Sequence, residues 1–147
     1  MTPDLSFPIL VDVFGFCISA PQSRIDKGQD EISIEYLYSD DEIHTTLPNG
    51  CNLFFGDEFH ETSGRNKNNK DLILKNQSDR GKPKIVESNG GQGVFDLSEN
   101  NVLAKKSDFA DAISKDQILI SQDSWNNFKP IFEKIDAIIS LNNNKSE

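Results

Sequence analysis

The segment from Asp57 to Glu61 holds the densest group of side chains that could bind a metal ion or transfer a proton. It includes His60, and the only other histidine of the chain is His44. His44, Asp57 and His60 could surround one divalent metal ion, with Cys51 as a fourth ligand, as in a small metal-dependent hydrolase. The spacing matches no established metal motif, because no second histidine follows His60 four residues later as in zinc proteases. We therefore expect no metal ion and no cofactor, and the hydrolase is kept as an alternative.

Neither cysteine has the surroundings of a catalytic nucleophile. A reactive cysteine or serine needs a base within hydrogen-bonding distance. Cys17 lies in an apolar segment, where a free thiol normally packs as a small hydrophobe, and no serine occupies a Gly-x-Ser-x-Gly turn. Two cysteines in 147 residues are also too few for a secreted scaffold held together by disulfides. The sequence therefore indicates a protein of the reducing cytoplasm that is not an enzyme.

Charge is distributed unevenly along the chain. The 147 residues include 15 Lys and Arg against 24 Asp and Glu, which gives a net charge of −9. Residues 1–61 hold twelve acids and two bases, whereas residues 62–84 hold seven bases and two acids. An excess of negative charge repels phosphate backbones and anionic lipids, and no segment reaches the roughly 18 apolar residues of a membrane helix. Nucleic acid and membranes are thus not the expected partners.

The acidic side chains of the first part of the chain are expected on one surface. Residues 31–38 alternate apolar and polar side chains, which predicts a strand with Glu31 and Glu35 on its outward face. Further acids crowd the turn that follows this strand and the end of the later strands. The predicted partner-binding residues are Glu31, Glu35, Asp40, Asp41, Glu42, Asp57 and Glu58, with Phe59 as an apolar anchor among them. Such a surface would attract a cationic partner and accelerate its association.

The elements that would position this surface are predicted to be mostly strands. Alternating segments in the first half of the chain are separated by turn residues, which predicts an antiparallel meander of about five to seven strands. We expect one domain over residues 1–147, since a chain of this length forms a single core. Within it, residues 1–61 would be an acidic, strand-rich part and residues 62–84 a basic part rich in loops.

Two helices are predicted near the end of the chain. Apolar residues from Trp125 to Ile139 recur at spacings of three and four, which predicts an amphipathic helix over residues 121–141. Pro130 leaves two alternatives: the helix starts near Asn127 with Pro130 in its first turn, or it is kinked at Pro130. A shorter helix is expected over residues 107–115, with a serine as its N-cap. The expected fold class is α+β, with the antiparallel sheet covered by these two helices.

These features favour a binding protein over an enzyme. The function that fits best is an inhibitor of the immunity or antitoxin type, which neutralises a basic toxin such as a nuclease through the acidic face. A DNA-mimicking inhibitor of a nucleic-acid enzyme would use carboxylates in the same way and is an alternative. An assembly module, whose acidic and basic segments dock between copies, is another. The sequence leaves the identity of the basic partner and the oligomeric state open.

Overall fold

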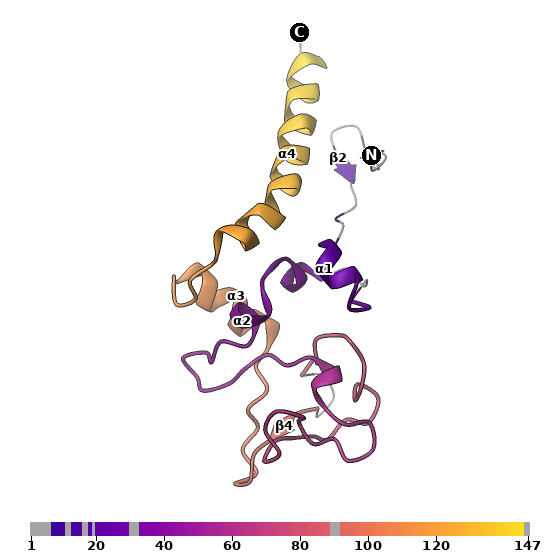
Figure 1. The fold of residues 1–147 in the computed structure, drawn as a ribbon. Helices are drawn as coiled ribbons and strands as arrows, with labels where there is room; N and C mark the ends of the chain where they lie inside the picture. Colours follow the sequence, from indigo (N-terminus) through magenta and orange to yellow (C-terminus); the bar gives the residue numbers. More distant parts are fainter. Residues whose placement is uncertain are drawn as a thin grey trace.

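Irregular segments gather in the lower part of the fold, the short helices lie above them, and a long C-terminal helix extends beyond (Figure 1). The computed structural model describes residues 7–10, 13–15, 18, 20–29, 33–88 and 92–145. The elements follow in the order β1 (Phe7–Leu10), β2 (Val13–Gly15), α1 (Gln22–Ile25), η1 (Ile34–Leu37), α2 (Asp40–Ile43), η2 (Gly56–Glu58), β3 (Ile73–Leu74), β4 (Val94–Phe95), α3 (Lys106–Ser114) and α4 (Gln122–Lys145). Cys17 and Glu31, which the sequence analysis singled out, lie outside the described residues.

The predicted α+β fold, a meander of five to seven strands covered by two helices, is wrong. In the residues that the structure describes, the strands form only two separate antiparallel pairs, β1 with β2 and β3 with β4. Strands β1 and β2 are joined by a short connection as a hairpin, whereas residues 75–93 separate β3 from β4. Helices α1 to α4 supply most of the regular structure, and α4 is the longest element. This part of the chain is therefore mainly helical.

The strand predicted over residues 31–38 is a 3-10 helix, η1, where the structure describes it. Ile34 is exposed, whereas Glu35, Tyr36 and Leu37 are all buried. Three consecutive buried side chains do not fit a strand with one solvated face. The alternation over residues 31–38 was misleading because the apolar Leu37 interrupts it, and residues 34–37 instead follow the period of three of a 3-10 helix.

The acids that follow form helix α2 instead of a turn between strands. The Ser39 Oγ accepts a hydrogen bond from the Glu42 N–H (3.2 Å), and the Glu42 Oε2 accepts one from the Ser39 N–H (2.9 Å). This reciprocal capping box satisfies N–H groups that have no partner within a helix. Its sequence signature is a serine followed three residues later by a glutamate, so the start of α2 is encoded locally.

The core consists of two apolar clusters that share one extended segment. Leu53 and Phe55 belong to the first cluster, which also contains Tyr36, whereas Phe54 belongs to the second. Successive side chains of an extended chain point to opposite sides, so this segment contributes to both clusters. The Val86 N–H donates to the Phe54 carbonyl oxygen (2.9 Å), and isolated bridges of this kind take the place of a continuous sheet.

The long C-terminal helix is present, but it does not cover a sheet. Helix α4 continues to Lys145, past the predicted end at residue 141, and the shorter predicted helix corresponds to α3. The first turns of α4 contact η1, because Asn127 Nδ2 donates to the Leu37 carbonyl oxygen (2.9 Å). The helix then bends and projects away from the centre of the fold (Figure 1), and Pro130 inside it removes one helical hydrogen bond. None of the described helices combines the length and apolar content needed to cross a membrane.

Candidate functional site

The buried guanidinium of Arg24 organises the surroundings of the predicted acidic residues. Arg24 comes from α1 and is only 4% exposed. Its Nε donates to the Tyr36 carbonyl oxygen (3.2 Å), its Nη2 to the Tyr38 carbonyl oxygen, and its Nη1 to Gln29 Oε1 (3.1 Å) and to Asp40. A charge can be buried at this depth because four of its five N–H donors have acceptors. Arg24 therefore fixes α1 to the segment that joins η1 and α2.

Asp40 is neutralised by two bases of the same chain. Its Oδ1 pairs with Arg24, and its Oδ2 accepts a hydrogen bond from Lys27 Nζ (2.8 Å). Burial alone would raise the pKa of Asp40, but the hydrogen bonds from Lys27 and Arg24 outweigh it and hold this pKa below its ordinary value. Asp40 is thus ionised and paired, and it offers little charge to an external partner.

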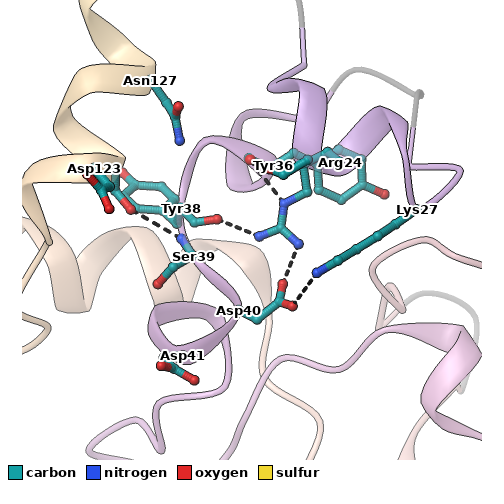
Figure 2. Close-up of a pocket in the computed structure, with 11 residues that line it drawn as sticks. Arg24, Lys27, Tyr36, Tyr38, Ser39, Asp40, Asp41, Asp123 and Asn127 are labelled. Carbon is teal, nitrogen blue, oxygen red and sulfur yellow. Dashed lines mark hydrogen bonds and ion pairs between the residues drawn. The ribbon is translucent and has the colours of Figure 1, made fainter.

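A groove opens between α1, α2 and the first turn of α4 (Figure 2). Its volume is about 310 Å³, and its lining includes Arg24, Lys27, Asp40, Asp41 and Asp123. Asp41 and Asp123 are exposed, and neither carboxylate has an ion pair or a hydrogen bond with the described part of the chain. Figure 2 shows Asp41 below Asp40 and Asp123 on the α4 side. The groove therefore contains Asp40, which is paired with two bases. It also contains the carboxylates of Asp41 and Asp123, which have no partner in the described part of the chain.

Glu42 is buried and hydrogen-bonded to two residues that line the groove, Ser39 and Ser124. Its carboxylate accepts hydrogen bonds from the Ser121 N–H (2.6 Å), the Ser124 hydroxyl (2.6 Å) and the Ser39 N–H (2.9 Å). Burial raises the pKa of Glu42, but these hydrogen bonds outweigh it and lower the pKa below its ordinary value. Glu42 thus ties α2 to the start of α4 and positions Asp41 relative to Asp123.

Two other predicted interface acids also point inward. Glu35 is buried, and its carboxylate lies 3.7 Å from Lys106 Nζ. Glu58 accepts a hydrogen bond from the Phe55 N–H, and its Oε1 lies 3.0 Å from His44 Nε2. The Glu58 carboxylate raises the pKa of His44 above its ordinary value, although burial of the ring opposes this shift. These acids support the fold and do not form one outward-facing surface with Asp40 and Asp41.

The remaining predicted residues are distributed around η2. Phe59 is fully buried in the second apolar cluster. Asp57 is half-buried, and burial raises the pKa of Asp57, with a smaller contribution from the negative charge of Glu58. His60 is exposed. Across residues 7–145 where they are described, no three His, Cys, Asp or Glu side chains gather as a metal site would require, so His44, Asp57 and His60 do not converge.

The structure brings Asp40 and Asp41 together with Asp123, a residue that sequence reasoning missed. Asp123 lies in the first turn of α4. An acid at this position is favourable to the helix dipole and so already has a structural explanation. The sequence carries no signal for its place in the groove, because only the structure shows that the adjacent Ser121 and Ser124 bind Glu42 across the fold.

Comparison with known proteins gives no match: no protein-family model, no curated protein and no solved structure is significantly similar to this chain. What the protein does has to be inferred from its own residues.

Proposed function

We propose that the protein is a binding protein of the immunity or antitoxin type, which inhibits a basic protein partner by receiving a cationic side chain of that partner in the groove. One observation carries the proposal: Asp41 and Asp123 line the same groove, and neither carboxylate has a partner among the residues that the structure describes. An arginine entering between them could donate charge-assisted hydrogen bonds to both carboxylates, because its planar guanidinium carries five N–H donors. A basic toxin, such as a nuclease, has cationic side chains of this kind on the surface that meets its substrate.

The charge of the groove favours a cationic partner over an anionic one. The lining includes Asp40, Asp41 and Asp123 against Arg24 and Lys27, which leaves a net negative charge. Both bases already pair with Asp40. The protein as a whole carries −9, so phosphate groups are repelled at long range as well as in the groove.

The walls of the groove are held in place before any partner arrives. Arg24 donates hydrogen bonds to the carbonyl oxygens of Tyr36 and Tyr38, which precede Asp41 in the chain. Glu42 accepts a hydrogen bond from Ser124, which lies next to Asp123 in α4. Because the backbone that carries both carboxylates is already held, it does not have to be ordered when a cation binds. The rigidity of the site is therefore consistent with an inhibitor, which must hold its partner for a long time.

The groove does not offer the groups of a hydrolase. The described lining residues include no histidine that could activate Ser23, Ser39 or Ser124, and Lys27, whose amine could otherwise act as a base, is paired with Asp40. The pKa of Asp40 is lowered by its bases, which makes Asp40 a poor proton donor at neutral pH. Binding is the chemistry that these side chains support best.

The test uses a six-residue arginine peptide as the probe and isothermal titration calorimetry at several salt concentrations. The double variant Asp41→Asn/Asp123→Asn should bind this peptide at least about tenfold more weakly than the wild type, because two charged acceptors are lost. The matched control is Asp71→Asn/Glu133→Gln, which removes the same charge from exposed positions outside the groove. The control should change the affinity by less than about threefold. Equal weakening of both double variants would mean that only net charge matters and would overturn the proposal.

A further inference from the structure

Helix α4 exposes a row of large apolar side chains. Trp125, Phe132, Ile135 and Ile139 have exposed fractions between 38% and 53%. Phe128 belongs to the same row and is half-buried, with its ring 5.1 Å from that of Tyr38. Apolar side chains left in water along one helix face mark a surface that another molecule can cover.

The spacing of this row is that of a helix-pairing seam. From Trp125 to Ile139 the steps are three, four, three and four residues, which corresponds to positions a and d of a heptad repeat. Pro130 falls at position f, opposite the seam, and is exposed. The proline therefore leaves the apolar row continuous. We call the residues Trp125, Phe128, Phe132, Ile135 and Ile139 the α4 seam.

Two charges beside the α4 seam identify the molecule that fits it. Lys129 and Asp136 are seven residues apart, so both occupy position e, on the same flank of the seam. Both are exposed, and in the described part of the chain neither has an ion pair. In an antiparallel pair of identical helices, e positions of one helix flank e positions of the other. Lys129 then lies beside Asp136 of the second copy, and the same pair forms twice by symmetry.

A parallel arrangement lacks this complementarity. In a parallel pair, position e of one helix faces position g of the other. Lys129 would then face Ser124 and Asp136 would face Ile131 of the second helix, and neither of these residues carries a charge. The flanking charges therefore select the antiparallel orientation.

We infer that the protein associates with a second copy of itself through the α4 seam, with the two α4 helices antiparallel. Helix α4 projects from the centre of the fold (Figure 1), so the seam beyond Pro130 is accessible to a second copy. Its first turn is fixed to the fold by the hydrogen bond from Ser124 to Glu42, which gives the projecting helix a defined direction. The inference does not depend on the groove or on its proposed ligand.

Sedimentation equilibrium of the full chain, from micromolar to millimolar concentration, tests this inference. The wild type should show a reversible monomer–dimer equilibrium. Phe132→Glu or Ile139→Glu should raise the dissociation constant of the dimer at least about tenfold, because each places a charge in the seam of both helices. Leu141→Glu is the matched control, since Leu141 is 55% exposed on α4 but lies off the seam; it should change the dissociation constant less than about twofold. A wild type that remains monomeric throughout, or a control that weakens the dimer as much, would overturn the inference.

Charge exchange tests the orientation separately. Lys129→Asp and Asp136→Lys should each weaken the dimer several-fold, because each brings like charges together at both symmetric contacts. The double variant Lys129→Asp/Asp136→Lys should restore the wild-type dissociation constant, since it exchanges the charges and keeps their complementarity. A double variant that is as weak as the single variants would contradict the antiparallel arrangement. All of these positions are exposed, and circular dichroism confirms that each variant is folded.

Discussion

Ser124 donates a hydrogen bond to Glu42 across 82 residues of sequence, with 2.6 Å between the hydroxyl oxygen and the carboxylate. Both residues are buried. The contact joins the cap of α2 to the first turn of α4, and it brings Asp41 and Asp123 to the same groove. The candidate binding site therefore depends on an interaction that contributes no charge to the groove surface itself.

Replacement of Ser124 by alanine should destabilise the fold. Ser124→Ala removes one donor from a buried carboxylate and leaves part of that carboxylate unsatisfied, which should lower the free energy of unfolding by about 1–3 kcal/mol. Ser140→Ala, at an exposed position of the same helix, should change it by less than about 0.5 kcal/mol. Urea denaturation followed by circular dichroism measures both. Equal effects of the two variants would show that the Ser124–Glu42 contact does not stabilise the fold.

Glu42 should make the stability depend on pH in the acid range. Its folded-state pKa is below its ordinary value of 4.5, so ionised Glu42 stabilises the fold above that pH. This contribution is lost as the pH falls below 4.5 through the lowered pKa, because the carboxylate must then be protonated. In urea denaturation between pH 7 and pH 3, the stability difference between wild type and Glu42→Gln should shrink as the pH decreases. A difference that stays constant over this range would contradict the assignment.

His44 should contribute with the opposite sign. Its folded-state pKa is above the ordinary value of 6.5 because of the adjacent Glu58 carboxylate, so protonated His44 stabilises the fold below pH 6.5. This stabilisation is lost as the pH rises through the raised pKa. NMR titration should show His44 titrating above 6.5, and Glu58→Gln should lower that pKa. The variant His60→Asn assigns the two histidine signals. A His44 pKa that is unchanged in Glu58→Gln would remove Glu58 as the cause.

Lys27 limits the negative charge of the groove and should therefore limit its affinity for cations. Lys27→Gln frees one oxygen of Asp40 from its ion pair, so the arginine peptide should bind about threefold more tightly. Lys70→Gln, an exposed position outside the groove, makes the same change in net charge and is the control. Titration calorimetry at low salt compares the two. A gain of the same size in both variants would indicate a long-range effect of charge alone.

Gly56 should be intolerant of any side chain. A Cβ at this position would lie 2.1 Å from the Asp79 carbonyl oxygen and 2.7 Å from that of Lys82, both of which are backbone atoms. Gly56→Ala should thus lower the free energy of unfolding by about 3 kcal/mol or more. At Gly50 a Cβ would contact nothing within 4 Å, and only its positive φ of 81° opposes a side chain, so Gly50→Ala should cost about 1 kcal/mol. Thermal unfolding of the two variants distinguishes a steric conflict from a conformational preference.

The acidic surface was predicted from a strand pattern, and the carboxylates took a different role in the fold. Glu42 and Glu58 each accept a hydrogen bond from the backbone N–H three residues earlier, at the start of a short helix. A carboxylate in this position satisfies an N–H that otherwise has no partner. Glu35 turned inward beside Lys106, which is distant in the sequence. Alternation over so short a segment does not distinguish a strand from the short helices found there. The predicted continuous acidic face depended on the predicted sheet, so both predictions were wrong for the same reason.

Features that depend on neighbours in the chain could be derived without coordinates. The apolar spacing of α4 reflects the 3.6-residue period of a helix, the start of α2 reflects its capping residues, and net charge is a sum over composition. The groove, by contrast, requires that Asp41 and Asp123 meet although more than eighty residues separate them. That meeting depends on where Arg24 and Glu42 find their buried partners, because a buried charge is stable only where distant parts of the chain supply enough hydrogen bonds.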